Sequence, residues 1–206
     1  VGKPEENDAF LEALRTIVYW ILAFSVFQSA MNGTGIILHF VSIFEQAGLT
    51  MTFAAQILSM GPLIGLGASL AMGFVLDRIR KLKFVLATVC GAQVVALILL
   101  AFLQSRGMAF LYAIIAGTAG RAVFFCNGII TARIFGRKYI GGILGATAAI
   151  NVVGTAIGPV VFGSAYDLLG GYREILLLSS AFPFIACVGA FFIRRPKRKL
   201  TELHNS

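Results

Sequence analysis

Residues 84–103, FVLATVCGAQVVALILLAFL, form an unbroken run of 20 residues without a charged side chain. An α-helix rises about 1.5 Å per residue and the hydrocarbon core of a bilayer is about 30 Å thick, so a run of this length is long enough to cross a membrane. Lys83 precedes the run, and Arg106 follows it closely. The sequence therefore predicts a transmembrane helix here.

Five more stretches have the same character. Hydrophobic residues make up 58% of the 206 residues and charged residues 13%, whereas a soluble domain is about half apolar and about a quarter charged. The predicted fold class is an all-α membrane protein with six transmembrane helices. The predicted spans are residues 17–44, 52–76, 84–103, 108–134, 140–162 and 175–193. Residues 1–16 are predicted to form a cytoplasmic amphipathic lead-in, and residues 194–206 a basic cytoplasmic tail.

The 17 Lys and Arg residues are distributed unevenly between the two sides of these spans. Fourteen fall on the side of both termini, Arg106 and Arg173 fall on the other side, and Arg121 lies inside a span. Cytoplasmic loops carry an excess of basic residues, so we expect both termini in the cytoplasm and a location in the cell (inner) membrane. The basic residues form no contiguous face, so the expected partner is the lipid bilayer and not nucleic acid.

No residue pattern indicates an enzyme, a metal site or a cofactor. Cys90, Cys126 and Cys187 all fall within predicted spans, and their spacing fits neither a metal site nor a disulfide framework. His39 and His204 have no serine partner in a protease-like motif, and a helix-borne pair of zinc-binding histidines is absent. We therefore expect no catalytic function.

The chain repeats a motif in reversed orientation. The second span ends Gly73-Phe74-Val75-Leu76-Asp77, and the fifth ends Gly163-Ser164-Ala165-Tyr166-Asp167, ninety residues later. Because three crossings separate them, the two acidic residues face opposite sides, which is typical of an inverted repeat of three helices plus three. Both spans also contain a proline, Pro62 or Pro159, and small residues that favour close helix packing. The predicted packing glycines are Gly61, Gly65, Gly73, Gly154 and Gly158.

The first and fourth spans are interrupted by glycines at corresponding places. The first contains Asn32-Gly33-Thr34-Gly35, and the fourth contains Gly117-Thr118-Ala119-Gly120 followed by Arg121. Loosened helical backbone is tolerated in a membrane where it lines a cavity, and paired interruptions are the best sequence indication of a transporter's binding site. The alternative interpretation is that these glycines only permit tight packing or a kink.

Arg121 lies near the middle of the fourth span. A central arginine costs about 3 kcal/mol on insertion scales, so it should face protein or water. One interpretation is that its guanidinium binds both oxygens of an anionic substrate such as a carboxylate. The other is an ion pair with an acidic residue, but no Asp or Glu lies in the middle of a span of this chain.

Six further polar side chains within the spans are candidates for the site. Each either hydrogen-bonds a solute in a cavity or bridges two helices. Asn32 is favoured for the solute because it lies in the glycine interruption, and His39 is a candidate proton relay because histidine is the side chain most often used to relay protons. Without a mid-span carboxylate, nothing else in the sequence indicates proton coupling. With Arg121, the predicted substrate-binding residues are Gln28, Asn32, Thr34, His39, Asn127 and Asn151.

Asp77-Arg78-Ile79-Arg80-Lys81 ends the second span on the cytoplasmic side. The basic residues follow from topology, but the acidic residue does not. Asp77 is a candidate to pair with Arg133 or Arg137 of the next cytoplasmic loop, which would hold one conformation of an alternating-access cycle. The predicted gating residues are Asp77, Arg78 and Arg137.

These residues resemble the major facilitator superfamily. Gly73-x-x-x-Asp77-Arg78-x-Arg80-Lys81 is similar to its conserved loop motif, in the version after the eighth helix, with Arg80 where a glycine usually stands. Residues 12–20, 135–145 and 158–172 resemble monocarboxylate and oxalate/formate antiporter relatives. Those relatives are expected to carry a cationic residue in the eighth or eleventh helix, whereas Arg121 would be in the tenth.

The resemblance implies that the chain is helices seven to twelve of a twelve-helix fold. A substrate cavity would lie between two six-helix halves and be lined by the first and fourth spans. The amino-terminal half is then the expected partner, and because the chain begins with Val1 and not Met, we expect a piece of a longer protein. The expected function is secondary active transport of a small solute, an organic anion such as a monocarboxylate, by antiport or symport. The alternative is a six-span homo-oligomeric channel or carrier.

Overall fold

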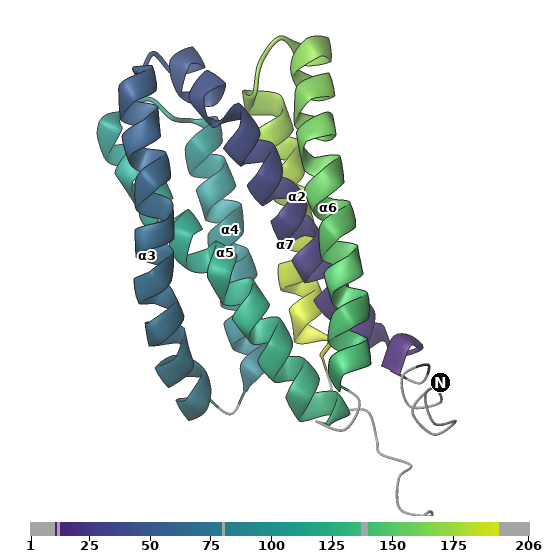
Figure 1. Ribbon diagram of the computed structural model, residues 1–206. Coiled ribbons are helices and arrows are strands. Elements are labelled where there is room, and N and C mark those ends of the chain that lie inside the picture. Colours follow the sequence, from purple (N-terminus) through teal and green to yellow (C-terminus); the bar gives the residue numbers. More distant parts are fainter. Residues whose placement is uncertain (1–10, 12, 80, 137–139, 194–206) are drawn as a thin grey trace, which may run out of the picture.

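The computed structural model describes residues 11, 13–79, 81–136 and 140–193, without the side chains of residues 75–77. Six helices occupy almost all of this part of the chain, and it contains no strand. All six are long and apolar enough to cross a membrane, which confirms the predicted fold class. The helices are α2 (Ile17–Gln46), α3 (Met51–Arg78), α4 (Leu82–Ala101), α5 (Arg106–Phe135), α6 (Ile140–Leu169) and α7 (Arg173–Phe191) (Figure 1).

The helix ends follow from local chemistry. The hydroxyl oxygens of Thr16 and Ser105 accept hydrogen bonds from the third residues after them and so cap α2 and α5. Gly136 and Gly170 have positive φ angles of 83° and 72° and directly follow the last residues of α5 and α6. Because no earlier residue stops α6, this helix runs seven residues beyond the predicted span 140–162. The tail 194–206 and most of the lead-in 1–16 lie outside the described residues.

The two halves of the chain have matching helices. The helices α5, α6 and α7 begin 89, 89 and 91 residues after α2, α3 and α4, with lengths of 30, 30 and 19 residues against 30, 28 and 20. The contacts follow the same rule: α2 packs extensively on α6, α3 packs on the corresponding α5, and α4 packs on α7. Three crossings separate each pair, so the repeat is inverted, as the Gly-x-x-x-Asp match predicts.

Basic residues gather at one end of the bundle. Figure 1 shows that α2, α4 and α6 begin at the end where α3, α5 and α7 finish. Among the described residues this end carries Arg15, Arg78, Lys81, Lys83 and Arg133, whereas Arg106 and Arg173 begin helices at the opposite end. The bundle therefore has the charge asymmetry of a membrane protein.

The helices α2 and α6 touch at the closest crossing of the bundle. A β-carbon added at Gly158 would lie 2.2 Å from the carbonyl oxygen of Met31, and one at Gly154 would lie 2.6 Å from that of Phe27. Only glycine fits at such distances, so these two predicted packing residues lie at a helix contact. A β-carbon at Gly61 or Gly73 would meet nothing within 4 Å, so no described neighbour requires glycine there.

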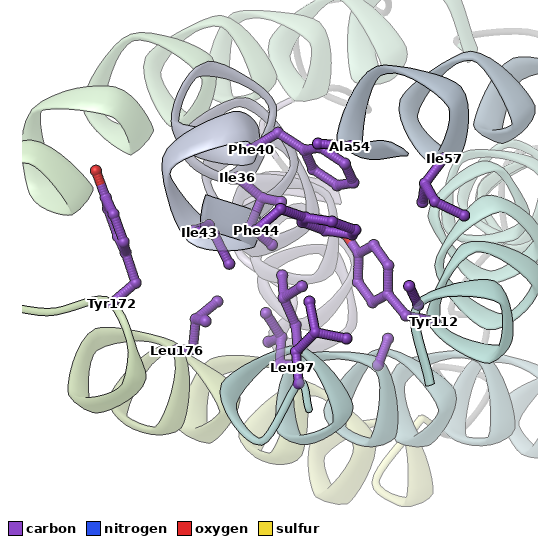
Figure 2. Close-up of a cluster of buried hydrophobic side chains, with 14 of the residues drawn as sticks. Ile36, Phe40, Ile43, Phe44, Ala54, Ile57, Leu97, Tyr112, Tyr172 and Leu176 are labelled. Carbon is purple, nitrogen blue, oxygen red and sulfur yellow. The ribbon is translucent and has the colours of Figure 1, made fainter. Parts of the chain in front are cut away.

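The apolar core leaves two helices largely uncovered. Figure 2 shows the cluster around Phe40, Phe44, Leu97 and Tyr112, where α2, α4 and α5 meet. In contrast, only 11% of the apolar window of α3 and 17% of that of α6 is buried, against 56% for α2. These two helices stand at opposite edges of the view in Figure 1. Their outer faces are available for lipid or for another bundle.

Candidate functional site

A cavity of about 660 Å³ lies between α2, α3, α4 and α5. Its walls are mostly apolar, with Ile36, Phe40 and Ile57 among them. The polar residues that line it are Gln28, Ser29, Asn32, Gln93, Tyr112 and Arg121. A large, mainly apolar cavity with a few polar groups is the usual form of a small-molecule site.

The glycine-rich segments of α2 and α5 both reach this cavity. Gly33, Gly117 and Gly120 line it, as do Gly61 and Pro62 of α3. The helices α2 and α5 nevertheless continue without a break through these segments. The glycines therefore shape the cavity by lacking side chains and not by loosening the backbone. Pro62 has no amide hydrogen, so the carbonyl of Leu58, which also lines the cavity, lacks its usual helical donor.

Gln28 and Asn32 lie one turn apart on α2, and both are buried residues that line the cavity. Gln28 is fully buried, and Asn32 is 6% exposed. The Nε2 group of Gln28 donates to the carbonyl of Ser25 at 3.0 Å and to Oε1 of Gln93 at 2.8 Å. Among the described residues, neither Oε1 of Gln28 nor either polar atom of the Asn32 amide has a hydrogen-bond partner.

Arg121 reaches the same cavity from the middle of α5. Its stem lies against α3 at Gly65, where an added β-carbon would come within 3.0 Å of Nε and 3.1 Å of Cγ. The predicted packing residue Gly65 thus makes room for the arginine. No carboxylate of the described residues forms an ion pair with Arg121, and none lines the cavity. The guanidinium is exposed and is available to an anion from outside these helices.

Two of the predicted site residues bridge helices outside the cavity lining. The hydroxyl oxygen of Thr34 lies 2.8 Å from the carbonyl of Ala30 and 3.1 Å from that of Thr155 on α6. Thr155 is four residues before Pro159, whose missing amide hydrogen leaves this carbonyl without its helical donor. The Thr34 hydroxyl has one hydrogen, which it can donate to Ala30 within its own helix or to this carbonyl across the contact between α2 and α6.

His39 connects α2 to α6 and to the start of α7. Its Nε2 atom lies 3.3 Å from the carbonyl oxygen of Pro159, and its Nδ1 atom lies 3.0 Å from the hydroxyl of Tyr172. A carbonyl only accepts, so Nε2 carries the proton and Nδ1 accepts from Tyr172. Burial raises the pKa of Tyr172, which keeps the phenol protonated for this role. Both ring nitrogens of His39 thus lie within hydrogen-bonding distance of a partner.

Asn127 and Asn151 also lie outside the cavity lining. Asn127 is buried, and its amide nitrogen donates to the carbonyl of Leu22 at 3.0 Å, which ties α5 to α2. Asn151 is half-buried on α6. Of the seven predicted residues, the structure brings Gln28, Asn32 and Arg121 to one cavity.

Sequence reasoning missed Gln93, Ser29 and Tyr112. The Nε2 group of Gln93 donates to the Ser29 hydroxyl at 2.8 Å, so an amide from α4 connects to two polar residues of α2. A signal for Gln93 was present, because it is the one amide in the uncharged run of residues 84–103. Tyr112 carries no comparable signal, since aromatic residues are common in such helices.

The predicted gating residues fall where the structure describes little. Arg78 is exposed at the end of α3, whereas Arg137 and the side chain of Asp77 lie outside the described residues. Within the described ranges no three His, Cys, Asp or Glu residues form a group able to hold a metal ion.

Comparison with known proteins identifies the family. A search of curated proteins found no match. The family model of the Major Facilitator Superfamily matches residues 22–205, which includes all or most of each of the six helices. This is a family of transporters and not of enzymes. The all-α bundle of membrane-length helices agrees with membership of this family. The chain belongs to the Major Facilitator Superfamily.

Proposed function

We propose that this chain is the carboxy-terminal six-helix half of a secondary active transporter for a small organic anion, such as a monocarboxylate. Membership of the superfamily supports the general part of this proposal, which is transport of a solute by a multi-pass membrane protein. The observation that supports an anion is Arg121, a cation that lines the cavity without an acidic partner among the described residues.

The cost of a cation at this depth supports the choice of an anion. Arg121 lies halfway along a 30-residue helix, where an arginine costs about 3 kcal/mol on insertion scales. An anion that arrives in the cavity would offset this cost, and the planar guanidinium can donate two parallel hydrogen bonds to a carboxylate. The neighbouring amides of Gln28 and Asn32 add donor and acceptor atoms that orient the solute.

The uncovered faces support a second six-helix half as partner. On α3 the side chains of Leu63, Leu66, Leu70 and Phe74 are 69%, 61%, 74% and 76% exposed. An amino-terminal half of the same transporter, packed beside α3 and α6, would complete the cavity, and rocking of the halves would open it to each side in turn. The charge asymmetry favours an inner membrane with both termini in the cytoplasm.

The loop after α3 is the proposed gate. An ion pair between Asp77 and Arg137, beside Arg78, would stabilise the conformation in which the cytoplasmic ends of α3 and α5 are close. Replacing Asp77 by Asn should then change the transport rate by several-fold while leaving membrane insertion intact. An unchanged rate in this variant would remove the gating role, and it would leave the solute site untouched.

The proposed function is tested by uptake into vesicles that contain the full-length protein. Labelled carboxylates of different sizes are offered with and without a pH gradient, to the wild type and to the variants Arg121→Gln and Arg106→Gln. Both variants lose one positive charge from α5, but Arg106 lies at the helix start, with its guanidinium 5.4 Å from the ring of Phe53. We expect at least a tenfold loss of uptake in the first variant only. Equal uptake by the wild type and Arg121→Gln would contradict the proposal.

A further inference from the structure

Three unpartnered polar atoms in the cavity restrict the chemistry of its ligand. They are Oε1 of Gln28 and the Oδ1 and Nδ2 atoms of Asn32, on side chains that are more than nine-tenths buried. Such groups are almost always hydrogen-bonded in folded proteins, because leaving them unpaired away from water is costly. Gln28 and Asn32 are four residues apart on one helix, so their amides lie on the same face and can contact one ligand.

The orientation of the Gln28 amide is fixed by its neighbours. Its two N–H groups are directed at the carbonyl of Ser25 and at Oε1 of Gln93, both of which accept hydrogen bonds. Turning the amide over would place Oε1 against these acceptors. The free atom of Gln28 is therefore an oxygen, and it can only accept.

Two free amide oxygens can each accept a hydrogen bond from a donor group of the ligand. A simple carboxylate has only acceptor atoms, so it can bind Arg121 and the amide nitrogen of Asn32 but cannot satisfy either oxygen. A hydroxyl group has one hydrogen and satisfies one of them. An ammonium group is a poorer candidate, because it would stand near the Arg121 cation and no acidic side chain of the described residues lines the cavity.

Resting on the function proposed above, we infer that the transported anion is a small hydroxylated carboxylate whose hydroxyl groups donate to the amide oxygens of Gln28 and Asn32 while its carboxylate binds Arg121. The cavity of about 660 Å³ holds a molecule of this size, and its apolar wall contacts the carbon skeleton. Gln93 is assigned as a positioning residue, because it holds the Gln28 amide from α4 without itself having to touch the ligand.

Three acids that share one carbon skeleton test this inference. Propionate, lactate and glycerate are three-carbon carboxylates with no, one and two hydroxyl groups. Their binding to the full-length protein in lipid nanodiscs is measured by titration calorimetry. We expect the dissociation constant to fall at least tenfold from propionate to glycerate, with lactate between them, since a site built to hydrogen-bond hydroxyl groups rejects an analogue that lacks them.

Variants identify the atoms responsible. Gln28→Leu and Asn32→Leu should each reduce the ratio of the dissociation constants of propionate and glycerate. Gln93→Leu should also reduce this ratio, because the Gln28 amide would no longer be held in place. The matched control is Gln56→Leu, which removes an exposed amide of α3 outside the cavity lining and should leave the ratio unchanged. A loss of folded protein lowers the apparent number of binding sites in the titration and leaves the ratio of the dissociation constants unchanged.

Binding of the three acids to the wild type tests the inference even if every variant misfolds. Equal binding of all three acids, lost in Arg121→Gln, would overturn the hydroxyl inference and leave the anion transporter standing. If none of the three acids binds, the hydroxyl inference and the anion proposal both fail. A graded series that Gln28→Leu and Asn32→Leu leave unchanged would show that other atoms recognise the hydroxyl groups, which contradicts the inference.

Discussion

At the scale of single residues, five of the predicted site residues divide into two groups by what they contact. Gln28, Asn32 and Arg121 line the cavity and keep free hydrogen-bonding atoms. Thr34 and His39 instead contact carbonyl groups of α6. The second group stabilises the packing of α2 on α6, and only the first has atoms to offer a solute.

His39 is predicted to stabilise the fold without carrying protons. Its replacement by Phe removes hydrogen bonds to Pro159 and Tyr172, each worth about 1 kcal/mol, so the melting temperature should fall by several degrees. Tyr172→Phe, which loses one of the two, should produce a smaller decrease. Uptake in both variants should keep the wild-type response to a pH gradient. Loss of that response in His39→Phe alone would assign the proton relay to His39.

At the scale of helices, close packing depends on a few glycines at the crossing of α2 and α6. The backbone carbonyls of Phe27 and Met31 leave no room for a β-carbon at Gly154 or Gly158. Lipid provides no hydrophobic drive between helices, so such backbone contacts are a main source of their association.

Gly158→Ala is predicted to destabilise the bundle much more than Gly145→Ala. Both glycines lie in α6, but a β-carbon at Gly158 would overlap the Met31 carbonyl, whereas one at Gly145 would meet nothing within 4 Å. Overpacking of this kind costs about 1–3 kcal/mol. Thermal unfolding in nanodiscs measures the difference in stability between the two variants. Equal melting temperatures would show that the crossing of α2 and α6 has room for a β-carbon at Gly158.

At the scale of the whole molecule, helices of both repeats surround the cavity that Arg121 lines. The helices α2, α3 and α4 of the first repeat and α5 of the second line it, and the outer faces of α3 and α6 stay uncovered. This arrangement suits a bundle that packs beside another.

The chain expressed alone is predicted to insert with six spans and to show no uptake. Co-expression with an amino-terminal six-helix half should restore transport if, as proposed, that half completes the cavity. Uptake by the chain alone, together with a homo-oligomer on native gels, would instead favour a six-span homo-oligomeric carrier.

The sequence predicts much of the fold. Which side chains line the cavity is harder to predict, for a physical reason. Uncharged runs such as residues 84–103 specify the helices. Because a charged side chain in lipid is costly, the sequence also predicts that Arg121 faces water or protein. Whether Asn32 or Thr34 faces the cavity depends on which side of α2 packs on α6, because residues two positions apart point to nearly opposite sides of a helix, about 200° apart. Gln93 is recognisable as the one amide of residues 84–103, but only the structure shows that its partner is Gln28.

A comparison of propionate with its uncharged amide, propionamide, tests the central claim that Arg121 binds an anion. The two compounds have nearly the same shape and differ in charge, and their binding to the full-length wild type and to Arg121→Gln is measured in nanodiscs. We predict that the wild type prefers propionate at least tenfold and that Arg121→Gln binds both compounds equally. The same preference in both proteins would contradict the claim.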